Sequence, residues 1–500
     1  MSGVRHELTR REILAGAATG ACALALGACG GATRPASSGS TLLSSWSDPR
    51  ATGELRPGAG AALLERTELA PSSPLGEVWA TLAHVTDAHV LDAESPARVT
   101  FLDRLGPPFT STFRPHEALT AQVLDGALRA VRELAPDAVI QGGDLIDNAQ
   151  ANELERAFAT LHGGAVDPSS GASGYFGVQW AGDPDPFYYR PDVDAPRHPG
   201  MLASATSAFR ARGLGAPCYP VLGDHDLLLQ GVVAPTPLAD AIATGARAVW
   251  ELPADLQVPH GIARLAAAAP DGLATGGLME RLIGVLLSAP SVRVPADARR
   301  RPLAAAEVVD RLRTQAGLPG GGQLLDYSFD LGLHLRVIVL DLVRREGGSG
   351  GLVHPGQARW LQAQLASAGE RWVLLFSHQP LTSTAGGERL LALLDAHPRV
   401  LAAVWGHTHR NQIVPRPGPA GGYWLINTAS LIDYPQQARA LRVRASAGGA
   451  AIQTWMLDHV PGGVAGLGDI SRELAYLDAQ GGRPQGFAGT PLDRNVTLYR

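Results

Sequence analysis

Five short apolar runs, each followed within three residues by aspartate or histidine, constrain this chain of 500 residues more than any other feature. Runs of this length that are bounded by glycine or proline are typical of buried strands. The polar residues then lie at the carboxyl ends of the strands. The runs and the residues that follow them are Val78–Val85 before Asp87-Ala88-His89, Ala138–Gln141 before Gly143-Asp144, Cys218–Leu222 before Gly223-Asp224-His225-Asp226, Val373–Phe376 before Ser377-His378, and Val400–Trp405 before Gly406-His407-Thr408-His409.

Helical patterns separate some of these runs. Apolar residues between Leu119 and Leu134 fall on one helical face, and a second helical pattern follows Pro355. Strand, helix and strand in succession predict an α/β fold with a covered sheet. Because ligands in such folds collect at the carboxyl ends of strands, we expect the five clusters to meet at one site.

The clusters offer carboxylates and imidazoles and contain no cysteine. Donors of this kind suit divalent Mn, Fe, Zn or Mg. An aspartate and a histidine two residues apart can face one ion if the backbone turns between them. Glycines that permit such close backbone approach stand beside the clusters, at Gly142, Gly143, Gly223 and Gly406.

The ordered set of clusters resembles the calcineurin-like metallophosphoesterase superfamily. The motifs of that superfamily run D-x-H, G-D-x-x-D, G-N-H-D/E, an isolated H, and G-H-x-H. All five occur here in order, the second as Gly143-Asp144-Leu145-Ile146-Asp147, and the resemblance covers roughly residues 78–458. Within the superfamily the chain resembles secreted actinobacterial members that carry a twin-arginine export signal and long insertions.

The resemblance implies a four-layer α/β/β/α sandwich and two divalent metal ions. One ion would be held by Asp87, His89, Asp144 and His409, and the other by Asp144, Asp224, His378 and His407. A hydroxide activated between the two ions would attack phosphorus in line. The resemblance also makes His225 the residue that stabilises the transition state or protonates the leaving oxygen, with Asp226 to orient it.

One ligand position departs from the superfamily pattern. The third motif usually carries asparagine, and here it carries Asp224. Three carboxylates then face two divalent ions, which leaves less excess positive charge for an anionic phosphate. We expect the site to keep its metals but to favour a more charged metal or a less charged substrate, such as a diester. The second motif ends in Asp147, which disfavours the subclass that uses a tyrosinate-bound iron.

Two histidines outside the clusters have simpler explanations. We expect His84, within the first apolar run, to be a buried residue that packs in the core or supports the ligands. We expect His116, after Pro115, to be a solvated loop residue.

The N-terminus is typical of an export signal. Arg10 and Arg11 resemble a twin-arginine motif, and residues 15–28 are apolar but too short to span about 30 Å of hydrocarbon. Residues 26–29 resemble a lipobox. We therefore expect residues 1–29 to be a signal peptide and Cys29 to be lipidated. The alternative is that Cys29 is only a small residue near a cleavage site. This predicts an exported protein at the extracellular face of the cytoplasmic membrane or in the cell envelope.

The remaining segments complete the expected organisation. Residues 30–77 are rich in Gly, Ser and Pro at their start and predict a flexible tether. Insertions at about 152–216 and 227–322 either frame the site or are surface elaboration. Residues 459–500 are expected to form a loosely ordered tail.

The net charge limits the classes of binding partner that we expect. A formal net charge of -5 provides no basic footprint, so we expect no generic nucleic-acid binding. The expected partner is a phosphate-ester substrate, and the motifs do not separate a phosphomonoester from a phosphodiester. The alternative is a surface metal-binding lipoprotein with little or no turnover, in which Asp224 is the first sign that catalytic activity has been lost. Retention of His225 weighs against that alternative.

Overall fold

All five predicted strands and both predicted helices are present in the computed structural model. It describes residues 37–105, 111–183, 187–251, 289–480 and 486–500. The helices are α2 (Thr120–Leu134) and α9 (Gln357–Ser367). The strands are β4 (Leu75–Val85), β5 (Ala138–Gln141), β8 (Cys218–Pro220), β13 (Trp372–Ser377) and β14 (Val400–Trp405).

The strands belong to two large sheets. The seven-stranded sheet has the order β3-β19-β18-β17-β4-β5-β8, and β4, β5 and β8 are parallel within it. Its other strands are β3 (Leu64–Arg66), β17 (Gln437–Ser446), β18 (Gly449–Asp458) and β19 (Val496–Tyr499).

The six-stranded sheet has the order β11-β12-β13-β14-β16-β15, with β12, β13, β14 and β16 parallel. The strands not yet introduced are β11 (Tyr327–Leu331), β12 (Leu335–Leu340), β15 (Gln412–Arg416) and β16 (Tyr423–Asn427). Parallel strands in both sheets therefore deliver polar residues at their carboxyl ends.

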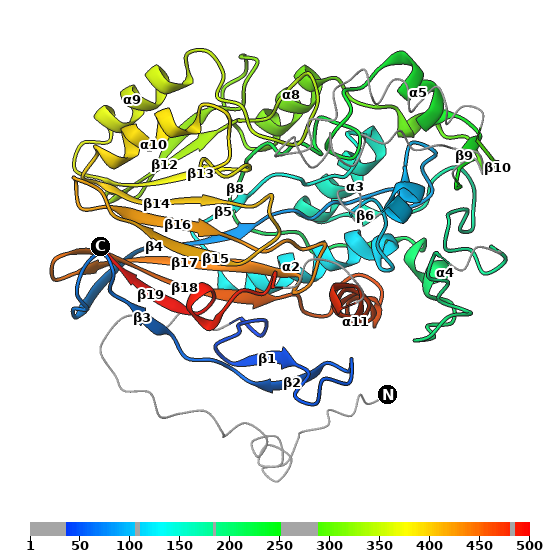
Figure 1. Ribbon diagram of the computed structural model, residues 1–500, viewed down its shortest axis with the longest axis horizontal. Helices are drawn as coiled ribbons and strands as arrows, with labels where there is room; N and C mark the ends of the chain where they lie inside the picture. The colour runs from blue at the N-terminus through cyan, green and yellow to red at the C-terminus, as the bar shows by residue number, and fades with distance from the viewer. Residues whose placement is uncertain (1–36, 106–110, 184–186, 252–288, 481–485) are drawn as a thin grey trace, which may run out of the picture. The chain divides into compact units, whose positions relative to one another are not determined.

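Successive residues of β13 show how the sheets are layered. Leu374 and Phe376 join the core that also contains residues of the seven-stranded sheet, whereas Val373 and Leu375 join a second core with α9 and α10 (Gly387–Asp395). Both faces of the strand are apolar because both are covered. Figure 1 shows α9 and α10 outside the six-stranded sheet.

The seven-stranded sheet is covered in the same way. Helix α2 packs against β17 and β18, and α3 (Ala151–His162) and α11 (Leu467–Gln480) pack against α2. The predicted α/β/β/α sandwich is confirmed.

Smaller elements complete the described part of the fold. The pairs β6 (Ala165–Val166) with β7 (Phe209–Arg210) and β9 (Arg247–Val249) with β10 (Ser291–Arg293) fall in the two expected insertions. The other helices of the described ranges are α4 (Met201–Ala205), α5 (Pro237–Thr244), α8 (Ala305–Gln315), η1 (Thr100–Leu105), η2 (Glu117–Leu119), η3 (Ala298–Arg300) and η4 (Pro491–Asp493).

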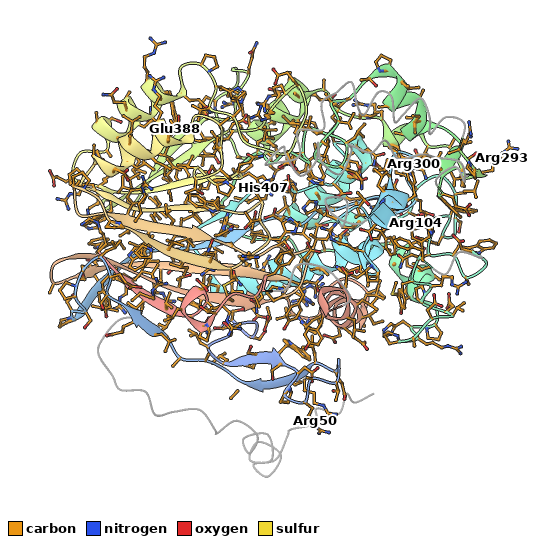
Figure 2. The ribbon with its side chains drawn as sticks, viewed as in Figure 1. Arg50, Arg104, Arg293, Arg300, Glu388 and His407 are labelled. Carbon is orange, nitrogen blue, oxygen red and sulfur yellow. The ribbon has the colours of Figure 1, made fainter. Side chains whose placement is uncertain are left out.

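A buried ion pair anchors the second insertion. Arg300, labelled in Figure 2, is fully buried, and its Nε lies 3.1 Å from Oδ2 of Asp92. Ser170 of the first insertion accepts a second bond from Arg300 and donates to Asp92. Both insertions are thus tied to the loop that follows β4.

The expected tether and tail are more ordered than the sequence suggested. Within the expected tether, residues 30–77, the chain forms a hairpin of β1 (Ser44–Ser47) and β2 (Arg56–Ala59), and β3 follows the hairpin. In place of a loose tail, residues 459–500 contain α11 and β19, and β19 pairs with β18 and β3. Backbone hydrogen bonds to distant strands order both segments, and no local pattern encodes such bonds.

The expected signal peptide and Cys29 lie outside the described residues, so export and lipidation stay predictions. Ala36–Arg500 form one compact unit. Across the described ranges, no helix is long and apolar enough to cross a membrane.

A fully buried arginine holds the C-terminal segment in place. Arg439 of β17 is 0% exposed, and burial lowers the pKa of its guanidinium to about 9. Among the described residues, the side chain donates only to neutral acceptors. They are Thr428 Oγ1, Thr454 Oγ1, Asn411 Oδ1 and the carbonyl oxygens of Asn427, Asp493 and Arg494.

Replacing Arg439 by Met is expected to lower the free energy of unfolding by about 3 kcal/mol or more, because several buried acceptors lose their donor together. Urea unfolding followed by circular dichroism measures the change. Arg444→Met in the same strand is the control, since Arg444 lies at the surface and should cost about 1 kcal/mol or less. Equal losses of unfolding free energy in the two variants would contradict the stabilising role of Arg439.

Candidate metal centre

The structure brings all seven predicted ligands together. Each follows a parallel strand, and the strands come from both sheets, so the ligands face one another where the two sheets end. Figure 2 labels His407 of this group near the middle of the view. Asp87 and His89 follow β4, Asp144 follows β5, Asp224 follows β8, His378 follows β13, and His407 and His409 follow β14.

The backbone turns sharply at most of these ligands. Five of the seven have positive φ angles, in the left-handed region that non-glycine residues seldom adopt. Residues held there cost free energy and cluster at functional sites. The turns let residues two positions apart face the same point. The angles are 53° at Asp87, 43° at His89, 49° at Asp144, 64° at His407 and 56° at His409.

Glycines make this convergence possible. A Cβ atom at Gly223 would lie 2.1 Å from Oδ1 of Asp144, and one at Gly406 would lie 2.3 Å from Oδ2 of Asp87. Any side chain at either position would displace a carboxylate of the site. The predicted close approach at these glycines is confirmed.

One group of donors comprises Asp144, Asp224, His378 and His407. Four of their ligand atoms lie within 4.8 Å of one another. Nε2 of His378 lies 3.0 Å from Oδ2 of Asp144 and 3.3 Å from Oδ1 of Asp224. Nδ1 of His407 lies 3.2 Å from the same oxygen of Asp224. This group can hold one divalent ion.

A second group comprises Asp87, His89 and His409. Nε2 of His409 lies 3.3 Å from Oδ1 of Asp87. Asp144 stands between the two groups, because its Oδ2 is 3.6 Å from Nε2 of His89 as well as 3.0 Å from Nε2 of His378. The arrangement matches the two expected ligand sets, with Asp144 within reach of both.

Unpaired imidazole nitrogens fit a metal ion. Nε2 of His89 and Nε2 of His378 are buried and make no hydrogen bond within the described part of the chain. The opposite nitrogens are occupied, since Nδ1 of His378 lies 2.9 Å from the carbonyl oxygen of Gly142 and Nδ1 of His89 lies 2.9 Å from Oδ1 of Asp147. A proton on Nδ1 leaves a lone pair on Nε2, and a buried lone pair without a partner suits a cation.

The electrostatics of the cluster also call for positive charge. Burial raises the pKa of Asp87 and Asp224, but neighbouring imidazoles outweigh it and hold both pKa values below the usual range. Conversely, burial lowers the pKa of His378, and the carboxylates of Asp144 and Asp87 raise it well above its usual value. Buried carboxylates thus stay ionised only with a cation beside them.

His225 stands at the rim of the cluster. Its side chain is 21% exposed, and its backbone N–H donates to Oδ1 of Asp144 at 2.9 Å. Nδ1 lies 2.9 Å from the carbonyl oxygen of Asp147 and 3.2 Å from that residue's Oδ1. Burial lowers the pKa of His225, but Asp144 and Asp147 raise it to about 10. Nε2 of His225 lies 4.0 Å from Oδ2 of Asp224.

The expected partnership between Asp226 and His225 is not what the structure shows. Oδ1 of Asp226 accepts the backbone N–H groups of Leu145 and Ile146, and Oδ2 accepts that of Gly223. Asp226 therefore joins the loops after β5 and β8. Asp147 is the carboxylate that orients His225, because the β5 loop turns back toward the third motif.

Several supporting residues escaped sequence reasoning. Asp433 accepts from Nδ1 of His409 at 2.6 Å, Arg114 pairs with Asp433, and Gln379 donates to Oδ1 of Asp224 at 3.0 Å. Asp433 lies beyond the end of β16, the parallel neighbour of β14. Its place after a parallel strand is the one signal that could have identified it.

The two histidines outside the clusters differ from each other. His84 is buried, with Nδ1 2.9 Å from Oγ1 of Thr428, as expected for a core or supporting residue. His116 is not solvated but 1% exposed, and its Nε2 contacts the carbonyl oxygen of Ile432 at 2.5 Å. The loop that carries His116 packs beneath the segment that contains Asp433, a contact between residues far apart in sequence.

No family model matches the chain, and no curated protein matches it either. Similar solved structures include a dimetal phosphatase from Danio rerio, at 14% identity and a TM-score of 0.37, covering 77% of this chain and 100% of that one. The sulfate thiohydrolase SoxB from Thermus thermophilus has 13% identity and a TM-score of 0.30, covering 82% and 62%. The NAD nucleotidase of Haemophilus influenzae has 10% identity and a TM-score of 0.27, covering 79% and 54%. The assignment of the site therefore rests on its own residues.

Proposed function

We propose that this chain is a metal-dependent hydrolase of phosphate esters. The observation that carries the proposal is the pair of adjoining donor groups, with Asp144 within reach of both and unpaired imidazole nitrogens aimed between the carboxylates. Asp87, His89, Asp144 and His409 would hold one divalent ion. Asp144, Asp224, His378 and His407 would hold the other. The ordered motifs of the superfamily support the same assignment.

Divalent ions held there supply charge neutralisation for phosphate oxygens and lower the pKa of bound water. The residues of the chain provide the rest. The carboxylates would hold the ions, and the glycines let the ligand-bearing turns approach one another closely. His225, at the partly exposed rim, places Nε2 beside Asp224, where it would carry a proton for the leaving group. That proton is placed to reach the leaving oxygen of a substrate.

Turnover separates this function from metal binding without catalysis. The full chain, loaded with Mn²⁺, is assayed against p-nitrophenyl phosphate and bis(p-nitrophenyl) phosphate. Release of p-nitrophenol from either ester supports the hydrolase, and the ratio of the two rates distinguishes a monoesterase from a diesterase. Two bound ions with no release from either ester would favour the metal-binding alternative.

We propose further that Asp224 biases the site toward diesters. Its carboxylate is fully buried, and Gln379 donates to the oxygen that also faces both imidazoles. Asparagine at this position keeps an oxygen for these contacts but removes one negative charge. The attraction for a dianionic phosphate therefore increases relative to that for a monoanion.

Asp224→Asn is expected to keep metal bound and to raise kcat/KM for the monoester relative to the diester by about tenfold. Steady-state kinetics on both esters and metal analysis of the same preparations measure this. Asp395→Asn, at a surface pair with Arg416, is the control and should leave the ratio unchanged. An unaltered ratio and metal preference in Asp224→Asn would refute the bias.

A further inference from the structure

The histidines of the metal centre differ in the group that contacts their Nδ1 atoms. Nδ1 of His378 faces a backbone carbonyl, which is neutral. Nδ1 of His89 faces the carboxylate of Asp147, and Nδ1 of His409 faces the carboxylate of Asp433 at 2.6 Å. His407 turns its Nδ1 toward Asp224 within the centre itself. The carboxylate-backed imidazoles therefore gather at one end, with Asp87.

Asp433 is itself held rigidly. Arg114 approaches it with two nitrogens, Nε at 2.6 Å from Oδ1 and Nη2 at 3.1 Å from Oδ2. Both residues are nearly buried, at 4% exposure each. The backbone N–H of Asp433 donates to Oγ of Ser430, and Nη1 of Arg114 donates to the carbonyl oxygen of Ser111. The carboxylate can hardly move away from His409.

A carboxylate behind a ligating imidazole has two effects. It holds the proton on Nδ1, so that Nε2 presents its lone pair, and it makes that nitrogen a stronger base toward a cation. At His409, Nε2 faces Oδ1 of Asp87 at 3.3 Å. Arg114 offsets the charge of Asp433, so the pair adds basicity to His409 without leaving a buried charge uncompensated.

We infer that Asp433, held by Arg114, is a positioning residue for His409. As a result, the metal site at Asp87, His89 and His409 binds its ion more tightly than the other metal site does. The inference rests on the proposed function and adds an order of occupancy to it. The end with Asp224, His378 and His407 lacks a carboxylate behind His378 and binds its ion more weakly.

Asp433→Asn in the metal-free full chain tests the inference by titration with Mn²⁺ in a calorimeter. We expect the wild-type chain to show a tight and a weak class of sites. The variant should weaken the tight class by about 10- to 100-fold and change the weak class little. Asp395→Asn is the matched control, because it removes the same charge from another two-nitrogen arginine pair. It should leave both classes unchanged.

Arg114→Lys provides a second variant that keeps the positive charge but loses the planar two-nitrogen contact. It should weaken the same class by a smaller factor, and it decides the question if Asp433→Asn does not fold. Thermal unfolding of the metal-free proteins identifies a loss of fold. An unchanged tight class, or equal weakening of both classes in a folded variant, would overturn the inference. A wild-type chain that binds no Mn²⁺ would instead overturn the proposed function.

Discussion

Asp144→Ala should lose metal from both sites at once and lower kcat/KM by about 10³-fold or more. Its Oδ2 lies 3.0 Å from Nε2 of His378 and 3.6 Å from Nε2 of His89, so one carboxylate serves both donor groups. Losing charge stabilisation at two ions removes several kcal/mol of transition-state binding. Metal analysis after dialysis and the rate on bis(p-nitrophenyl) phosphate measure the two effects.

A strand-end aspartate outside the donor groups provides the control. Asp341 follows β12, is fully buried and pairs with Arg345 at 2.5 Å. Asp341→Asn should retain two ions even if it lowers stability. Loss of only one ion from Asp144→Ala would show that Asp144 does not bridge the groups.

His225→Gln should keep both ions and lower kcat by about 10²- to 10⁴-fold on a substrate with a poor leaving group. The imidazole belongs to neither expected ligand set. It groups with His89 and Asp147 at the partly exposed rim of the centre, where we expect it to supply a proton. A poor leaving group needs that proton more than p-nitrophenolate does. The loss should therefore be larger for phenyl phosphate esters than for p-nitrophenyl esters.

Asp147→Asn, assayed at saturating Mn²⁺ because Asp147 also contacts Nδ1 of His89, should reproduce the same dependence on the leaving group in weaker form, since Asp147 orients Nδ1 of His225. Asp226→Asn should instead lower stability, since its carboxylate accepts backbone N–H groups of two loops. A uniform loss across leaving groups in His225→Gln would argue for a purely structural role.

Local pattern was enough to predict the strands and the residues that follow them. A buried parallel strand is an apolar run, and its end is marked by glycine and by polar side chains, so Asp87, Asp144 and His378 could be identified one segment at a time. The same apolar runs also predict that both faces of each sheet are covered. Their alternate residues enter two different cores, as in β13.

Partners across the fold could not be predicted in this way. Sequence proximity suggested Asp226 for His225, whereas the turn after β5 supplies Asp147. Asp433 is 24 positions from His409 and meets it only because β16 lies beside β14. The ordered C-terminal segment likewise depends on its hydrogen bonds to β18 and on the guanidinium of Arg439.

The sequence by itself determined which residues could bind metal, because ligand type and strand-end position are local properties. Only the tertiary structure decided which carboxylate supports which histidine and how Asp144 stands between the two groups. Those relations depend on the register of the parallel strands and on the packing of two sheets, which bring together residues that no local pattern connects.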